Sequence, residues 1–470
     1  MRWATILLGL SAVACAPDRE SAPLDTEGGT TGEATTLELP GTSSTTEAAS
    51  TGTVATSDPD DSTGDTTGEP PASSSCDRLL EVVATVERSE ETTEEAFAIR
   101  GLLDEIRYSA DGFPIVEDER TCFVYVGDPG ESLSVAGDFD DWDPTAHPLT
   151  SVPSELGLHY AVIDMPRAQA VGLYKFVRDG ADFFADPEAR RFGWDEFGEY
   201  SRLAPDPTRS HHERWREFEE GIGALEPRTI TVYVPAGGFE AAALPTLYLH
   251  DGQNLFAPDA LFGGWQASVT LDALIADGTI APLLAIGIDN TTARFDEYTH
   301  VEDDLGGVIE GGQADAYGDF LVDGLIPFID ARYPTSTAVA DTAVLGSSLG
   351  GLVSIYLGWR HPDVFGWAGA MSGSFFWGSE LGNPTMAELV TQMPPTGLSI
   401  YLDSGGGAQP TCPADADNYC DTVELADALR AQGWIDEQDL VYRWEPGAMH
   451  NEAAWAARFG PMLTDWLFGG

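Results

Sequence analysis

Positive charge is scarce in this sequence. Its 470 residues include 23 Lys and Arg against 78 Asp and Glu, which gives a formal net charge of −55. Nucleic acid is bound through clusters of Lys and Arg, so this balance argues against a nucleic-acid-binding protein, and it disfavours adhesion to anionic lipid surfaces. The acidity indicates a hydrated exterior and identifies no substrate.

Cysteine is also scarce. Cys15 stands apart near the N-terminus, and four cysteines remain in the rest of the chain: Cys76, Cys122, Cys412 and Cys420. Four cysteines are enough for two disulfides, and their spacing favours Cys412–Cys420 and Cys76–Cys122.

Long apolar runs are missing as well. The stretch 4–13 follows Arg2 and is too short to span a bilayer, and no other segment is long and apolar enough to do so. The following residues, Ala12-Val13-Ala14-Cys15, resemble a bacterial lipobox with Ala12 in place of the commoner Leu. The resemblance implies a lipoprotein signal peptide over residues 1–15, with Cys15 lipidated. The alternative is an ordinary signal peptide that is cut at the same small residues. Both interpretations predict an exported protein. If Cys15 is lipidated, we expect the mature protein to be anchored to the outer membrane or cell surface.

Composition divides the remaining chain into three parts. Residues 16–75 are mostly Ser, Thr, Gly, Pro and acidic residues with few large apolar ones, a composition that predicts a disordered tether because it buries too little apolar surface. Residues 76–205 begin with helical spacing, in which Phe97 is one expected core position, and continue as short strands. From residue 213 to 470, strands alternate with helices, which predicts a mostly parallel sheet covered on both faces. Active sites of such sheets lie at the carboxyl ends of the strands.

One motif predicts a nucleophile. Gly346-Ser347-Ser348-Leu349-Gly350 follows the apolar strand TAVL and precedes a helix, the context of a G-x-S-x-G nucleophile elbow. Ser348 is therefore the expected nucleophile. Its base should follow later in the chain, and His450, after the last strand, fits that order, whereas His361 lies too close in sequence.

The acid of the triad is less clearly indicated. Asp403 ends the strand SIYL, while Asp415, Asp417 and Asp421 lie further along, near the expected Cys412–Cys420 disulfide. Asp417 is preferred, and Asp403 remains the alternative.

The backbone N–H groups of Leu349 and Gln253 are the expected oxyanion donors. Leu349 begins the helix after the elbow, and Gln253 lies in the loop after the strand TLYL. His250 and Asp251, at the end of that strand, are interpreted as structural rather than catalytic.

Seven segments in order resemble the putative esterase family, which includes enterochelin, feruloyl and acetylxylan esterases. They are HDGQNLF, GGWQ, AIGIDN with Arg294 to Tyr298, LGSSLGGL, MSGSFFWG, YLDSG and GAMHNEAAWAARF. The resemblance covers roughly residues 213–470 and implies an α/β-hydrolase fold and a Ser–His–acid triad, with no metal or other cofactor. It also implies that Arg294, Glu297 and Tyr298 line or brace the substrate pocket. The cysteine-bearing insertion 405–420 departs from the family pattern where the acid should lie.

A second resemblance lies upstream. VAGDFDDW, YKFV and Asp179-Gly180 resemble the early-set, immunoglobulin-like modules that bind glycogen in some proteins. In that interpretation Trp142 and Lys175 contact a glycan, with Phe183 as a second aromatic. The favoured interpretation is that Trp142 caps the edge of a sandwich that shapes the esterase cleft.

Together these features predict an exported serine carboxylic-ester hydrolase. The two-domain layout favours a siderophore-type oligoester as the expected substrate. A feruloyl or acetyl carbohydrate ester is the alternative substrate, and a non-catalytic surface-binding protein is the alternative function.

Overall fold

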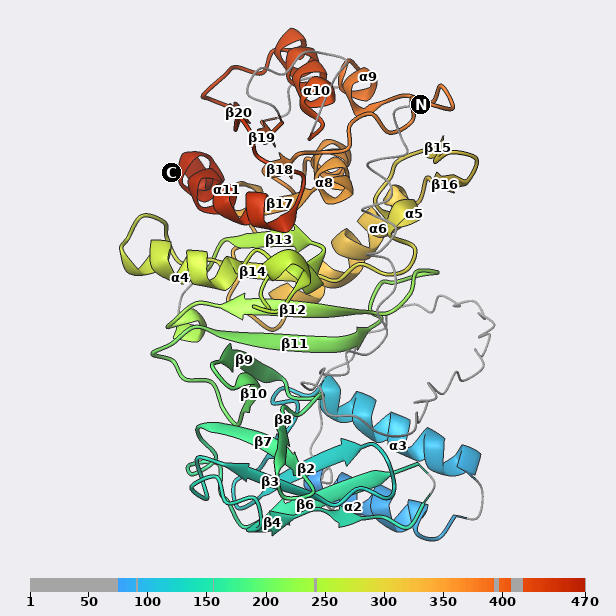
Figure 1. Cartoon of the computed structure of the whole chain (residues 1–470), viewed down its shortest axis with the longest axis vertical. Coiled ribbons are helices and arrows are strands. Elements are labelled where there is room, and N and C mark those ends of the chain that lie inside the picture. The colour runs from blue at the N-terminus through green and yellow to red at the C-terminus, as the bar shows by residue number, and fades with distance from the viewer. Residues whose placement is uncertain are drawn as a thin grey trace, which may run out of the picture. The chain divides into compact units, whose positions relative to one another are not determined.

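The computed structural model describes residues 75–89, 92–154, 156–240, 243–392, 397–406 and 417–469. The predicted signal peptide, Cys15 and the tether up to residue 74 lie outside these residues. The described chain opens with two helices, α2 (Ser75–Val86) and α3 (Thr92–Arg107) (Figure 1). Along α3 the core positions are Ile99, Leu102 and Ile106, three to four residues apart on one face. The prediction for Phe97 is wrong. This residue comes two positions before Ile99, so it lies on the opposite face of the helix, where it is 82% exposed.

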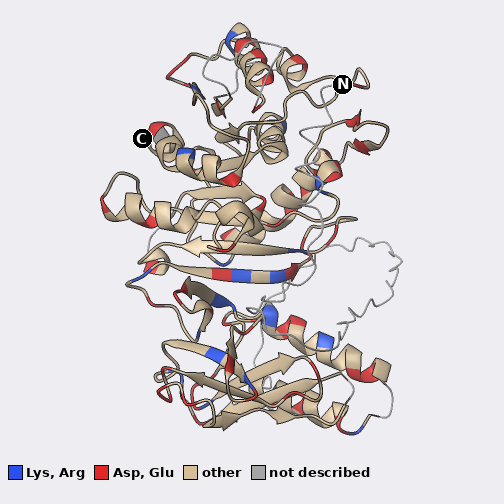
Figure 2. Cartoon of the chain, in the orientation of Figure 1, with Lys and Arg blue, Asp and Glu red and all other residues tan. Residues whose placement is uncertain are grey.

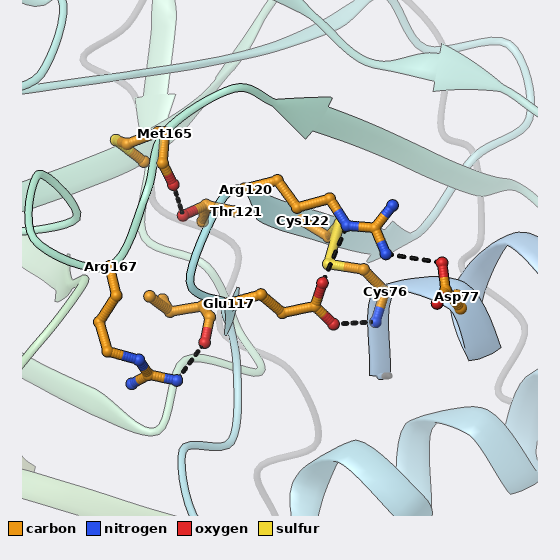
Figure 3. The surroundings of a disulfide bond; sticks show 9 residues. Cys76, Asp77, Glu117, Arg120, Thr121, Cys122, Met165 and Arg167 are labelled. Atoms are coloured by element: carbon orange, nitrogen blue, oxygen red, sulfur yellow. Dashed lines mark hydrogen bonds and ion pairs between the residues drawn. A yellow bond between two sulfur atoms is a disulfide. The ribbon is translucent and has the colours of Figure 1, made fainter. Parts of the chain in front are cut away.

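The predicted disulfide between Cys76 and Cys122 is confirmed. Figure 3 shows its surroundings, where the Glu117 carboxylate accepts hydrogen bonds from the Cys76 N–H at 2.9 Å and from Arg120 at 2.8 Å. The bond closes a loop across a sequence separation of 46 residues, which in the chain-entropy description stabilises the fold by about 4 kcal/mol. Cys420 is also disulfide-bonded, but its predicted partner Cys412 lies outside the described residues.

A two-sheet sandwich follows the helices. One sheet has the order β1-β2-β6-β5, and the other is the β10-β7-β3-β4 portion of a larger sheet, with β8 paired to β7. Phe123 of β2 packs against Val135 of β3 and Phe176 of β7 between the sheets, while Cys122 and Val124 face α2 and α3. The strands are β1 (Ile115–Val116), β2 (Thr121–Val126), β3 (Leu133–Gly137), β4 (His147–Pro148), β5 (Thr150–Ser151), β6 (Leu158–Ile163), β7 (Leu173–Arg178), β8 (Asp182–Phe184), β9 (Arg191–Asp195) and β10 (Gly198–Arg202).

The remaining strands form the sheet that carries the candidate site. Its order is β11-β12-β14-β13-β17-β18-β19-β20; β12 is antiparallel to both of its neighbours, β11 and β14, and the pairs from β14 to β20 are parallel. This is the strand order of the α/β-hydrolase fold. The strands are β11 (His211–Phe218), β12 (Arg228–Val234), β13 (Thr246–His250), β14 (Leu284–Ile288), β17 (Thr342–Ser347), β18 (Trp367–Met371), β19 (Ser399–Ser404) and β20 (Leu440–Trp444), and a separate hairpin joins β15 (Glu302–Asp304) to β16 (Ile309–Gly311).

Helices cover both faces of this sheet, as the alternation of helices and strands predicts. Alternate residues of β17 face opposite ways: Val344 joins one buried cluster, and Ala343 and Leu345 join the other. The α-helices are α4 (Ala267–Ala276), α5 (Arg294–Glu297), α6 (Ala314–Asp319), α7 (Ile326–Asp330), α8 (Leu349–Arg360), α9 (Met386–Val390), α10 (Tyr419–Gln432) and α11 (Glu452–Asp465). A π-helical stretch at Phe320–Leu325 joins α6 to α7, and short 3-10 turns lie at 238–240, 252–254, 261–263, 339–341 and 467–469.

The two parts share one sheet, because β9 pairs with β11 at His212↔Phe192 and Glu213↔Arg191. The boundary expected between residues 205 and 213 stays a prediction. Acidic residues lie along loops and helices throughout, and the fewer basic residues include several on β11 (Figure 2). Within the described ranges, no helix has the length and apolar character needed to cross a membrane.

Candidate active site

The residue expected as nucleophile lies in a strained turn. Ser348 separates β17 from α8 with φ 56° and ψ −122°, a conformation that non-glycine residues rarely adopt. Gly346 is required at this turn, because a Cβ there would lie 2.5 Å from the backbone of Gly350. The turn is fixed by a hydrogen bond from the Ser348 N–H to the Met371 carbonyl at 3.0 Å.

Three side chains named from the sequence meet at the carboxyl edge of the sheet. The His450 Nε2 lies 3.0 Å from the Ser348 Oγ, and the His450 Nδ1 lies 2.7 Å from the Asp417 Oδ1. They come from three different places: the β17–α8 turn, the loop between β20 and α11, and the residues just before α10. The arrangement is that of a nucleophile, a general base and an orienting acid.

The second carboxylate oxygen of Asp417 is held on several sides. It accepts hydrogen bonds from the Ser372 hydroxyl at 2.8 Å and from the Gly405 N–H, and the Arg458 guanidinium lies 3.7 Å away. The Ser372 hydroxyl in turn accepts from Trp455 at 3.1 Å and from Arg458 at 2.9 Å. These contacts fix the carboxylate and leave its other oxygen for His450.

The alternative acid, Asp403, has different partners. Its carboxylate pairs with Arg458 at 3.2 Å and accepts hydrogen bonds from the Tyr401 hydroxyl at 3.0 Å and the Ser372 N–H at 3.2 Å. Burial raises the pKa of the Asp403 carboxyl to about 6, against the opposing effect of Arg458. The structure therefore places Asp417, and not Asp403, against His450. Asp415 lies outside the described residues.

The two expected oxyanion donors have unused backbone N–H groups. Within the ranges that the structure describes, neither the Leu349 N–H nor the Gln253 N–H donates a hydrogen bond. The Gln253 side chain accepts from the Asn290 N–H at 3.2 Å, which fixes the loop on which the donor lies. A second hydroxyl, that of Ser374, lies 3.3 Å from the Ser348 Oγ.

Asp251 holds the turn that precedes Gln253. It adopts φ 59°, and its carboxylate accepts two hydrogen bonds from Arg294, both at 2.7 Å, and one from Asn290 at 2.6 Å. Burial alone would raise the pKa of the Asp251 carboxyl, but the Arg294 charge and these hydrogen bonds outweigh it, so the pKa is lowered. Asp251 and Arg294 thus form an ion pair that fixes the loop, which fits the structural interpretation of Asp251.

Two of the three residues expected to line or brace the substrate pocket are completely buried and do not line it. Glu297 is completely buried in a two-point ion pair with Arg228, at 3.0 and 2.9 Å. Tyr298 is also completely buried, and its hydroxyl accepts from the Asp251 N–H at 3.3 Å. Both residues brace the site and cannot touch a ligand. His250 is likewise buried, with its Nδ1 2.9 Å from the Tyr317 hydroxyl, and burial lowers its pKa to about 3.

A narrow pocket of about 60 Å³ opens beside Ser348. Arg294 contributes to its lining, as predicted, together with residues that the sequence reasoning did not single out, among them Asn254, Trp265, Glu452 and Trp455. The Asn254 amide lies 3.5 Å from the Glu452 carboxylate, and burial raises the pKa of that carboxyl.

Sequence reasoning missed several supporting residues, namely Ser372, Ser374, Glu452, Trp455 and Arg458. Two of the family-like segments, MSGSFFWG and GAMHNEAAWAARF, contain all five, so their position beside the nucleophile strand and the histidine was the available signal. Among the described residues, no group of three or more His, Cys, Asp or Glu side chains is placed to hold a metal ion.

The upstream residues expected to contact a glycan do not form an open platform. Lys175 is 6% exposed, and its ammonium group donates to the Phe197 carbonyl at 2.9 Å. Trp142 is half-buried, with its indole N–H bonded to Asp138 at 2.9 Å and its ring centroid 6.4 Å from that of Phe183. A sugar cannot reach the Lys175 ammonium in this arrangement, because the side chain is buried.

Comparison with known proteins gives matches to esterases. A family model described as putative esterase matches residues 225–466. The uncharacterized protein YbbA of Bacillus subtilis is 24% identical over 248 residues, which cover 52% of this chain and 93% of that protein. The endo-1,4-beta-xylanase/feruloyl esterase of Xylanibacter ruminicola is 28% identical over 178 residues, 37% of this chain; the match spans only 23% of that protein. Among solved structures, the enterobactin esterase FES of Shigella flexneri is 18% identical with a TM-score of 0.41. The match covers 74% of this chain and 94% of the esterase chain.

Proposed function

This chain belongs to the putative esterase family and is a carboxylic-ester hydrolase, and on that premise we propose that it cleaves its substrate through an acyl intermediate on Ser348. One observation carries the proposal. The His450 ring bridges the Ser348 hydroxyl at 3.0 Å and the Asp417 carboxylate at 2.7 Å, so one imidazole both accepts the hydroxyl proton and is oriented for that task.

The reaction follows from these contacts. The Ser348 Oγ attacks the ester carbonyl carbon as the His450 Nε2 takes its proton, and Asp417 stabilises the imidazolium that forms. The N–H groups of Leu349 and Gln253 donate to the developing oxyanion. The C–O bond to the alcohol then breaks, and His450 gives its proton to the leaving oxygen. Water repeats these steps on the acyl-enzyme, which releases the acid and restores Ser348.

The substrate that the pocket favours is a neutral ester. Arg294 supplies the positive charge among the lining residues, but its guanidinium is engaged by Asp251, and Glu452 adds a carboxylate. A ferric catecholate siderophore carries net negative charge, and it would have to approach this lining and a chain of net charge −55. The relative from Xylanibacter ruminicola is named as a feruloyl esterase as well as a xylanase. We therefore place a feruloyl or acetyl carbohydrate ester ahead of the siderophore-type oligoester.

The chemistry is tested with Ser348→Ala in the full chain. Hydrolysis of p-nitrophenyl acetate and covalent labelling by a fluorophosphonate should both disappear, with an unchanged thermal melting curve. Ser354→Ala is the matched control, because it removes another buried hydroxyl, bonded to the Gly350 carbonyl at 2.7 Å in the same helix. Substantial turnover by Ser348→Ala would remove Ser348 from the reaction.

The substrate class is tested with a panel of esters. Feruloylated arabinoxylan fragments, acetylated xylo-oligosaccharides, and ferric and iron-free enterobactin should be compared by kcat/KM. We expect the carbohydrate esters to be preferred, and a preference for ferric enterobactin would reverse the order of the two substrate classes.

Export and lipidation are also part of the proposal. They rest on the lipobox-like residues before Cys15 and gain support from the Cys76–Cys122 disulfide, since disulfides persist in oxidising compartments. Mass spectrometry of the mature N-terminus after expression in a bacterial host distinguishes a diacylglyceryl Cys15 from an unmodified cleaved end.

A further inference from the structure

A second cavity, separate from the Ser348 pocket, lies between the β9–β10 hairpin and α4. Its volume is about 640 Å³, within the range of small-molecule binding sites, which runs from about 300 to 1,000 Å³. We call it the hairpin cleft. Its lining includes Trp194 and Tyr200 from the hairpin, Tyr233 from β12, Phe256 from the loop before α4, and Val269 and Asp272 from α4.

Aromatic rings supply much of its wall. Trp194 is partly exposed, and its ring packs edge-on against Phe192 and His212, with both centroids 5.2 Å away. Its indole N–H makes no hydrogen bond within the described part of the chain and is not enclosed. A surface with an apolar ring beside a free N–H suits a ligand that has apolar faces and polar edges.

A buried histidine in the wall lacks a partner. His212 is 9% exposed and lines the hairpin cleft, surrounded by aromatic rings that include Phe256, whose centroid lies 5.1 Å away. Across the residues that the structure describes, neither of its ring nitrogens makes a hydrogen bond, and the Nε2 is fully enclosed. Buried polar groups in folded proteins are almost always hydrogen-bonded, so the Nδ1, which is not enclosed, has capacity that a ligand in the cleft would use.

The protonation state of His212 narrows the ligand chemistry. Burial lowers its pKa to about 3, so the ring is neutral at ordinary pH and its Nδ1 is a donor or an acceptor, according to the tautomer. A hydroxyl group, which both donates and accepts, can bond to the Nδ1 of either tautomer. A carboxylate or phosphate would find no cationic imidazole there.

The charges around the hairpin cleft also disfavour an anion. Asp195 and Asp272 contribute carboxylates, against one basic side chain, Arg209, among the lining residues. Asp272 already accepts hydrogen bonds from the Tyr233 hydroxyl at 2.7 Å and the Ser210 hydroxyl at 2.8 Å. Carboxylates in this position accept hydrogen bonds from a polyhydroxylated ligand and repel an acidic one.

The loop before α4 contributes to both cavities. Leu255 and Trp265 line the Ser348 pocket, and the next residue after each, Phe256 and Gln266, lines the hairpin cleft. A ligand in the hairpin cleft is therefore separated from the catalytic pocket by one loop.

We propose that the hairpin cleft binds a neutral saccharide unit, with sugar C–H faces on Trp194 and hydroxyl groups at His212 and Asp272. The identity of the saccharide, as the carrier of the ester, rests on the proposed function. Binding itself requires no turnover, so the two proposals can fail separately.

The test uses the full chain carrying Ser348→Ala, titrated with xylohexaose and cellohexaose by isothermal calorimetry. We expect saturable binding to at least one of these oligosaccharides. Adding Trp194→Ala should weaken it at least tenfold, whereas Phe197→Ala should change it less than twofold. Phe197 is the matched control, because it lies in the same hairpin, is 78% exposed and does not line the cleft.

A second pair of variants avoids the risk that Trp194→Ala perturbs folding. Val269 is 63% exposed and lines the cleft, so Val269→Trp should fill the cavity and abolish binding without loss of stability. Val308→Trp, at a position that is 56% exposed and lies outside the cleft lining, is its control.

Three results would overturn the proposal: no heat of binding with either oligosaccharide, binding unaffected by Val269→Trp, or binding of free ferulate in place of both oligosaccharides. If the Ser348→Ala variant binds an oligosaccharide but the unsubstituted protein cleaves no ester, this proposal stands and the proposed function is refuted.

Discussion

The choice between Asp417 and Asp403 as the triad acid gives the sharpest test of the site. Asp417→Asn replaces an acceptor oxygen 2.7 Å from the His450 Nδ1 with an uncharged amide. The imidazole loses its stabilising charge and its fixed tautomer, which in serine triads lowers kcat by about 10⁴-fold. At about 1.36 kcal/mol per factor of ten, that is a loss of about 5.4 kcal/mol of transition-state stabilisation.

We expect Asp417→Asn to preserve the backbone at this position. Asp417 has φ 79°, a backbone conformation that Asn adopts more readily than most residues, so the turn should persist. Asp403→Asn is the matched control: it removes a buried carboxylate from the same cluster, but one whose partners are Arg458, Tyr401 and Ser372 instead of His450. We expect it to lower kcat by less than tenfold.

The assay is p-nitrophenyl acetate hydrolysis, with active sites counted by fluorophosphonate labelling so that misfolded protein does not enter kcat. Melting curves of both variants establish that each is folded. A larger loss of kcat in Asp403→Asn than in Asp417→Asn would refute the assignment of the acid and the reasoning from the hydrogen bonds around it.

Three further predictions concern stability and cofactors. Glu297→Gln should lower the free energy of unfolding by about 3 to 5 kcal/mol, because it leaves the buried Arg228 charge without its partner; chemical denaturation measures this, and a loss below about 1 kcal/mol would contradict it. The raised pKa of Asp403, about 6, means that its neutral form stabilises the fold at low pH and that this contribution is lost as pH rises through about 6. We therefore expect the melting temperature of the unsubstituted protein, measured relative to that of Asp403→Asn, to decrease as pH rises from about 4.5 to about 7. A difference that stays constant over this range would refute the raised pKa of Asp403. EDTA should leave kcat unchanged, and strong inhibition would reveal a metal requirement.

Local sequence predicted the expected nucleophile, Ser348, and the fold around it. A tight turn between an apolar strand and a helix needs small flanking residues, so Gly346, Ser348 and Gly350 could be interpreted without distant contacts. The alternation of apolar strands with helices likewise requires only local periodicity, and it predicted the parallel sheet and a helix that begins at Leu349.

The sequence order of the triad placed His450 late in the chain, but it could not choose the acid. Asp403 lies near the end of β19 and Asp417 follows that strand, and both are buried in one cluster around Arg458. Which carboxylate reaches the imidazole depends on how residues 417–419 approach the loop that carries His450, and that is a distance between segments far apart in the chain.

Tertiary structure alone decided which side chains are accessible. Glu297 and Tyr298 adjoin Arg294 in sequence, yet α5 directs them into the core towards Arg228 and Asp251, while Arg294 lines the pocket. The hairpin cleft is formed by β9, β10, β12 and α4 together, so no single segment signals it. Local sequence thus specifies turns and periodic faces, because these depend on neighbouring residues. Burial and proximity depend on packing across the whole sheet.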